Sequence, residues 1–150
     1  MTIAAHPITG ITGAEITGVD LAAPISTDLG AELRTQLSKY LVLVFQDQHL
    51  DIAAQKRLTK VFGTPMQLPY IEPMVDEPEL MKEAEDRSGV FGGDWHSDLS
   101  FIAEPPAGSI LNAIDVPPYG GDTLFANQVA AWDALPPWLK DLLDGRDAIH

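Results

Sequence analysis

The chain has 150 residues, no cysteine and a formal net charge of −13. Its 22 acidic and 9 basic residues include no basic run, which argues against nucleic acid and anionic membranes as partners, because both bind positive surfaces. The lack of cysteine excludes disulfides and thiolate metal sites and fits a reducing compartment. The longest apolar run, residues 40–45, is far shorter than the roughly 20 residues of a membrane span. We therefore expect a soluble, cytoplasmic protein without a targeting segment.

The N-terminal part is predicted to contain strands and helices in turn. Residues 3–8 and 15–19 are predicted to be short strands, separated by glycines that favour turns. Ser26 is a candidate N-cap of a helix whose leucines and Tyr40 form an apolar stripe. The apolar run at 41–45 is typical of a strand that is buried on both faces.

Asp51 is the candidate cap of a second helix, which Gly63 ends. The following residues, 64–78, contain four prolines, too many for a helix or a central strand. We interpret this loop as a lid within one fold, because long ordered loops often form walls of binding sites. Residues 79–83 are predicted to be a strand and 85–93 a polar segment.

The next part is predicted to be rich in strands. Residues 95–101 alternate large apolar residues with small or polar ones, which is typical of a half-buried strand. Further strands are expected at 108–115 and 123–126, with a tight turn at 117–121 between them.

The C-terminal residues are predicted to be helical. Residues 130–143 have helical periodicity, interrupted by Pro136-Pro137, which we expect to begin a second helix at its first turn. Gly145 is expected to end that helix, and residues 147–150 to begin a further strand.

His96 and Asp98 are two positions apart and share one face of the predicted strand. Same-face neighbours on a strand are about 6.6 Å apart, so an imidazole and a carboxylate that lean together can bind one metal ion at about 2.1 Å. The alternative is a histidine that is simply hydrogen-bonded to a nearby carboxylate. His6 and His49 have no partner at ligand spacing, and we interpret both as surface or packing residues.

Several motifs occur in order along the chain. They are W-H-S-D at 95–98, P-P at 105–106 and G-G-D-T at 120–123, preceded by shorter matches at 13–21, 44–48 and 62–63. This order resembles the taurine dioxygenase/TfdA family of non-haem iron, 2-oxoglutarate-dependent oxygenases. Several short motifs in sequence are more specific than any one of them.

The resemblance implies a β-rich α+β fold, a double-stranded β-helix (a cupin-like jelly roll) with flanking helices, which is incomplete in this chain. Residues 1–150 would be the N-terminal part of a single dioxygenase domain. The implied reaction uses Fe(II), 2-oxoglutarate and O2 to hydroxylate a small organic substrate, releasing succinate and CO2. His96 and Asp98 would be two of three iron ligands, and Thr123 would contact the distal carboxylate of 2-oxoglutarate. The presence of Asp98 favours hydroxylation over halogenation.

Leu68, Tyr70 and Phe101 are the candidate substrate-contacting residues. Taurine-specific members of the family carry a histidine where this chain has Leu68, and an asparagine where it has Gly92. The resemblance therefore implies a small molecule other than taurine, such as an alkyl sulfate, an aryloxy acid or an amino-acid derivative. A homo-oligomer is compatible with the sequence.

In the family, the second iron histidine and an arginine that pairs with 2-oxoglutarate lie far downstream, and His150 matches a different position. We therefore expect residues 1–150 alone to be poorly folded and inactive. A cupin-like metal protein that does not use 2-oxoglutarate would need further histidines near His96. The main rival to the enzyme is a catalytically inert fragment, or a metal-binding or interaction module, of the same fold.

Overall fold

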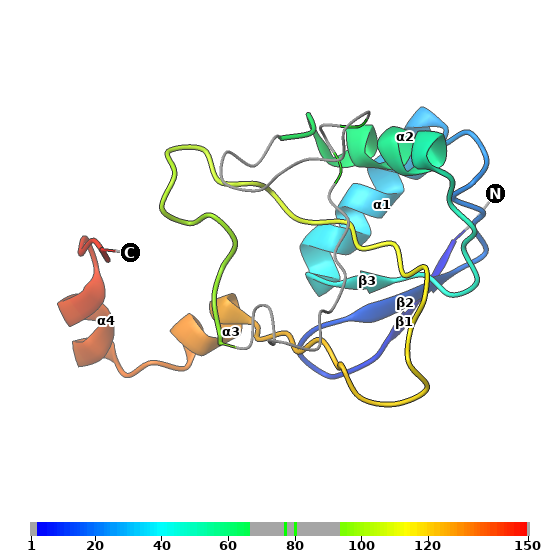
Figure 1. Ribbon diagram of the computed structural model, residues 1–150. Helices are drawn as coiled ribbons and strands as arrows, with labels where there is room; N and C mark the ends of the chain where they lie inside the picture. The colour runs from blue at the N-terminus through cyan, green and yellow to red at the C-terminus, as the bar shows by residue number, and fades with distance from the viewer. Residues whose placement is uncertain (1–2, 67–76, 78–79, 81–93, 150) are drawn as a thin grey trace. The chain divides into compact units, whose positions relative to one another are not determined.

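The computed structural model describes residues 3–66, 77, 80 and 94–149. The chain forms two compact units, one of Met1–Phe62 with Leu111–Ala148 and one of Gly63–Ile110 with Ile149–His150. The helices and strands shown in Figure 1 belong to the first unit. The predicted strand at 79–83, the polar segment at 85–93 and most of the 64–78 loop lie outside the described residues, apart from isolated positions.

A small mixed sheet forms the base of the first unit. Strands β1 (Ala4–Pro7) and β2 (Ala14–Thr17) are antiparallel, and β3 (Leu43–Val44) pairs with β2 in parallel, giving the order β1-β2-β3 (Figure 1). Gly13 adopts φ +85° at the turn before β2, where its carbonyl accepts from the Ile8 amide at 2.9 Å. The two predicted N-terminal strands are therefore confirmed.

The strand predicted at 41–45 is shorter and less buried than expected. Leu41 has φ +67° and its amide donates to the Leu37 carbonyl at 2.7 Å, so this residue ends the preceding helix. Only Leu43 and Val44 pair with β2, and both are half-buried. The apolar run at 41–45 is not a single strand, because its first residue, Leu41, is the C-cap of α1.

Helices α1 (Thr27–Tyr40) and α2 (Ile52–Phe62) begin where the sequence predicts. The Ser26 hydroxyl accepts from the Leu29 amide at 3.2 Å, and Asp51 Oδ1 accepts from the Ala54 amide at 2.6 Å. The helices contribute to a core whose fully buried apolar residues are Ala14, Ile16, Leu21, Leu33, Ala54 and Leu58.

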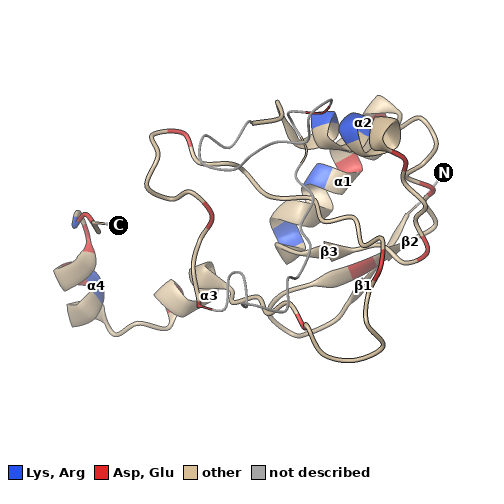
Figure 2. Cartoon of the chain, viewed as in Figure 1, with Lys and Arg blue, Asp and Glu red and all other residues tan. Residues whose placement is uncertain are grey.

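Five lysines and arginines of the first unit lie on α1 and α2, and Lys140 lies on α4, whereas acidic residues lie both in the loops and on helices and strands (Figure 2). Two of these basic residues hold backbone carbonyls. Arg34 Nη1 donates to the Val61 carbonyl at 2.7 Å, and Arg57 Nη2 donates to the Ala22 carbonyl at 2.9 Å. Arg34 thereby satisfies a carbonyl at the end of α2 that has no partner within the helix.

A glutamine side chain ties the segment after β3 to the core. Gln48 Oε1 accepts from the amide of buried Leu21 at 2.8 Å, and Gln48 Nε2 donates to the Gln46 carbonyl at 2.9 Å. Gln48 lies within the 44–48 match, so these two hydrogen bonds give that motif a structural role.

The C-terminal part of the first unit contains α3 (Gln128–Asp133) and α4 (Pro137–Leu143). Asn127 caps α3 by accepting from the Ala130 amide at 2.9 Å, and its Nδ2 donates to the Ile11 carbonyl at 2.7 Å. Pro137 is in the first turn of α4, as predicted, and Gly145 with φ +67° follows its end. None of the described helices is long and apolar enough to cross a membrane.

The strands predicted at 95–101, 108–115 and 123–126 are wrong for this structure, because none of these segments forms a strand, and neither do the described residues 147–149 of the strand predicted at 147–150. A strand is stable only when its backbone groups pair with a neighbour, and these segments have no such neighbour in the described part of the chain. Leu111, Ile114 and Leu124, which lie in two of these segments, are 69%, 86% and 70% exposed. The expected jelly roll is therefore not displayed by the described residues.

Candidate metal centre

The segment that carries His96 and Asp98 lies in the second unit and is a turn. Residues 98–101 form the turn, Leu99 has φ +50°, and the Ile102 amide donates to the Leu99 carbonyl at 3.1 Å. The strand prediction missed this turn because the apolar alternation of 95–101 does not report a left-handed residue. The turn nevertheless brings the histidine and the aspartate together.

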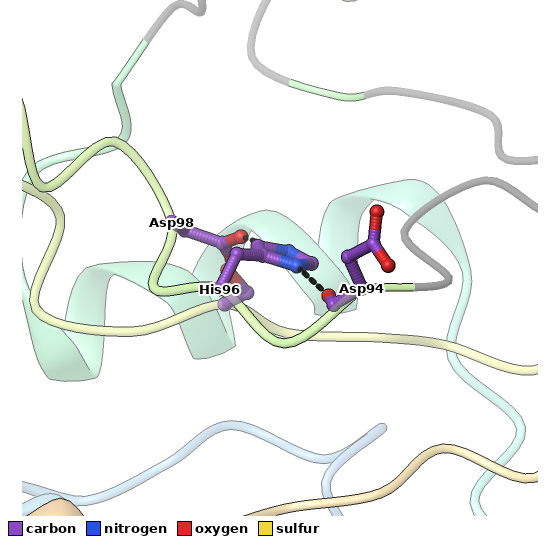
Figure 3. Close-up of polar contacts among 4 residues, drawn as sticks. Asp94, His96 and Asp98 are labelled. Atoms are coloured by element: carbon purple, nitrogen blue, oxygen red, sulfur yellow. Dashed lines mark hydrogen bonds and ion pairs between the residues drawn. The ribbon is translucent and has the colours of Figure 1, made fainter. Parts of the chain in front are cut away.

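His96 Nε2 lies 3.2 Å from Asp98 Oδ1, and the two side chains are 57% and 58% exposed (Figure 3). Two ligand atoms at right angles on one ion, with bonds of about 2.1 Å, are about 3.0 Å apart. The pair therefore has the spacing of two adjacent metal ligands. A nitrogen and a carboxylate oxygen are also the donor types of a two-histidine, one-carboxylate ferrous site.

The other ring nitrogen of His96 is held by the backbone. Nδ1 lies 2.8 Å from the Asp94 carbonyl oxygen, which can only accept, so Nδ1 donates the hydrogen (Figure 3). In the neutral ring, this arrangement leaves the Nε2 lone pair directed toward the Asp98 side. Metal-binding histidines commonly fix their tautomer in this way.

The hydrogen bond to the Asp94 carbonyl is the main reason that the pKa of His96 is raised above its ordinary value; desolvation opposes this effect, and the nearby Asp98 carboxylate adds to it. The carbonyl and the carboxylate both favour positive charge at the ring. The same surroundings favour a metal cation at Nε2.

Asp98 also has a partner on its outer oxygen. The Ser109 hydroxyl donates to Asp98 Oδ2 at 3.2 Å, so the two carboxylate oxygens have different neighbours. Neither Ser109 nor the Asp94 carbonyl is predicted by the motif or its spacing. A search for hydroxyls close after the triplet could have found Ser109, whereas a backbone carbonyl leaves no signal in the sequence.

A third ligand is not found in the described part of the chain, where no group of three or more His, Cys, Asp or Glu residues could hold a metal ion. His6 is exposed, and its Nε2 lies 3.1 Å from Thr17 Oγ1 across β1 and β2, which agrees with its interpretation as a surface residue. His150 lies outside the described residues.

The other predicted site residues lie in different parts of the chain. Thr123 belongs to the first unit and is exposed in an irregular segment after Gly120 and Gly121, whose φ values are +81° and +68°. Phe101 is 54% exposed in the turn of the second unit. Leu68 and Tyr70 lie outside the described residues.

A histidine and a carboxylate at ligand spacing, each with its outer atom hydrogen-bonded, have the donor types and the spacing of two ligands in a histidine–carboxylate metal centre. The model of the family described as "Taurine catabolism dioxygenase TauD, TfdA family" matches residues 4–150. The chain belongs to this family.

Two curated relatives are similar over nearly the whole chain. An alpha-ketoglutarate-dependent sulfate ester dioxygenase of Pseudomonas putida is 34% identical over 97% of this chain and 48% of its own length. An alkylsulfatase of Acinetobacter baylyi is 32% identical over 95% and 45%. Among solved structures, a taurine dioxygenase from Burkholderia xenovorans has a TM-score of 0.81 and 32% identity, covering 95% of this chain and 51% of its own. The chain thus spans about half the length of these proteins.

Proposed function

We propose that the protein containing this chain is an Fe(II)- and 2-oxoglutarate-dependent dioxygenase that hydroxylates a small organic substrate and releases succinate and CO2. The observation that carries this proposal is the 3.2 Å approach of His96 Nε2 and Asp98 Oδ1 in a chain of the TauD/TfdA family. The names of its relatives support the reaction class. They do not favour the inert-module alternative.

The proposed fold of the protein is the jelly roll of the family, with residues 1–150 in the N-terminal part of one domain that includes a proline-rich lid or loop at about 64–78. The family match over residues 4–150 and the TM-score of 0.81 with a taurine dioxygenase support this assignment.

Iron, when bound, would supply the activation of O2, with 2-oxoglutarate as the source of electrons. His96 would bind the ion through Nε2 while Nδ1 keeps its hydrogen bond to the Asp94 carbonyl. Asp98 would bind through Oδ1 and balance part of the positive charge of the ion. The Thr123 hydroxyl would donate to the distal carboxylate of 2-oxoglutarate, and Leu68, Tyr70 and Phe101 would contact the substrate.

A sulfate ester is the substrate class that the relatives favour, because the names of two of them, at 34% and 32% identity, refer to sulfate esters or alkyl sulfates. Hydroxylation of the carbon that bears the sulfate puts one oxygen atom of O2 on that carbon, and the other oxygen atom enters succinate. The resulting hydroxylated carbon loses sulfate and a proton and becomes an aldehyde. One substrate would thus yield one aldehyde, one sulfate, one succinate and one CO2.

The test is turnover by the purified protein that contains this chain, supplied with Fe(II), ascorbate, 2-oxoglutarate and a medium-chain alkyl sulfate. We expect aldehyde, sulfate and succinate in equal amounts, and no succinate when a chelator replaces iron. Succinate formation independent of iron, or no turnover with sulfate esters, sulfonates and aryloxy acids alike, would contradict the proposal.

A further inference from the structure

The carboxylate of Asp98 has two oxygens in different surroundings. Oδ1 faces His96 Nε2 at 3.2 Å, and Oδ2 accepts a hydrogen bond from the Ser109 hydroxyl at 3.2 Å. Ser109 follows Asp98 by 11 residues, and both residues belong to the second unit. The hydroxyl therefore marks one oxygen as the outer one.

The difference matters because a carboxylate can bind a metal ion with one oxygen or with both. A two-histidine, one-carboxylate ferrous site has three open positions when its carboxylate uses a single oxygen. A chelating 2-oxo acid takes two of these positions, and O2 needs the third. A carboxylate that binds through both oxygens would occupy one of them.

We propose that Ser109 is a positioning residue that keeps Asp98 bound to the metal through Oδ1 alone. The inference rests on the proposed metal site and concerns a residue that neither the motif nor its spacing identifies. By donating to Oδ2, the hydroxyl occupies a lone pair and draws charge from that oxygen, which makes it a weaker metal ligand. It also fixes the rotation of the carboxylate, so that Oδ1 stays turned toward His96.

Ser97 provides a matched control, because it lies between the two ligands, is exposed like Ser109, and makes no side-chain hydrogen bond within the described residues. A serine-to-alanine change there removes the same atom without touching Asp98. Ser109→Thr keeps a hydroxyl and tests whether the donor restores the behaviour.

The experiment measures Mn²⁺ binding to the protein that contains this chain by the electron paramagnetic resonance signal of free Mn²⁺. Ser109→Ala should strengthen Mn²⁺ binding, because the freed Oδ2 can then bind the ion together with Oδ1. Ser109→Thr and Ser97→Ala should bind as the unchanged protein does. Circular dichroism checks that every variant is folded. If Ser109→Ala does not fold, Ser109→Thr still tests the role of the hydroxyl.

A second readout separates positioning from general destabilisation. In infrared difference spectra of the Mn²⁺ complex, the two carboxylate stretching bands lie closer together when both oxygens bind the metal. Ser109→Ala should narrow this separation for the band that Asp98→Asn removes, and Ser109→Thr should restore it. An unchanged affinity and an unchanged band separation in Ser109→Ala would overturn the inference while leaving the metal site intact. Failure of the unchanged protein to bind Mn²⁺ would instead refute the proposed function, and this inference with it.

Discussion

At the scale of single residues, one backbone hydrogen bond decides which nitrogen of His96 faces Asp98. The Asp94 carbonyl takes the Nδ1 hydrogen at 2.8 Å, so the neutral ring presents a lone pair at Nε2. Two acceptors 3.2 Å apart repel unless a proton or a metal ion lies between them.

The first prediction concerns this pair. Asp98→Ala should abolish the iron-dependent decarboxylation of 2-oxoglutarate and the visible charge-transfer band of the iron–2-oxoglutarate complex, because it removes one ligand and its negative charge. Glu104→Gln, which removes an exposed charge elsewhere in the same unit, should leave both unchanged. An Asp98→Ala variant with the full band would show that the aspartate is not a ligand.

Thr123 is the subject of the second prediction. A hydrogen bond to a charged group contributes about 1.5–3 kcal/mol, so Thr123→Val should raise the KM for 2-oxoglutarate by about 10-fold or more. Thr123→Ser keeps the hydroxyl and should stay close to the unchanged protein. Steady-state kinetics at saturating substrate separates KM from kcat, and an unchanged KM would return Thr123 to a purely structural role.

The sequence predicted the meeting of His96 and Asp98 but not the way they meet. Two residues that are two positions apart lie close together both in a strand and in a tight turn. Either structure can therefore bring the side chains of His96 and Asp98 together. The left-handed conformation of Leu99 distinguishes the turn from the strand. A leucine gives no reason to predict this conformation, because a positive φ is uncommon for residues other than glycine. The partners Asp94 and Ser109 depend on backbone geometry and on a contact across 11 residues, so they required the structure.

At the scale of elements, the features that the sequence predicted correctly depend on local contacts. Ser26 and Asp51 accept from amides three residues ahead, and Pro137 begins α4 where its missing N–H costs nothing. The predicted strands of the second half depend instead on distant partners, and alternation alone does not supply them. Local rules therefore determined the helices, while the strand predictions succeeded only where β1, β2 and β3 pair.

The third prediction follows from the cap of α2. Asp51 Oδ1 satisfies the Ala54 amide at 2.6 Å, and Ala54 is fully buried in the core. Asp51→Ala should cost about 1 kcal/mol, which corresponds to a fall in Tm of about 2–4 °C for a domain of roughly 150–250 residues. Asp51→Asn keeps an acceptor and should lose less, as thermal unfolding followed by circular dichroism would record. Equal losses in the two variants would mean that the charge, and not the cap, carries the effect.

At the scale of the whole molecule, membership of the TauD/TfdA family narrows the reaction more than it narrows the substrate. Relatives of similar identity are named for sulfate esters at 34% and for 2,4-dichlorophenoxyacetate at 30%, and a structure at 32% is named a taurine dioxygenase. These substrates share an anionic group on a small organic body. The residues that contact the anionic group must therefore distinguish sulfate esters, aryloxy acids and sulfonates from one another.

The last prediction concerns this choice and rests on Leu68, which lies outside the described residues. A leucine cannot donate a hydrogen bond to a sulfonate, and a site without the partner that a polar ligand needs discriminates strongly against that ligand. We expect kcat/KM for a medium-chain alkyl sulfate to exceed that for taurine by at least about 100-fold, measured by succinate release. Leu68→His should raise turnover of taurine and lower that of the alkyl sulfate, because it adds a donor and removes apolar surface. Met66→Leu, a conservative change two residues earlier, should alter neither, and taurine turnover equal to that of the alkyl sulfate in the unchanged protein would exclude this account of specificity.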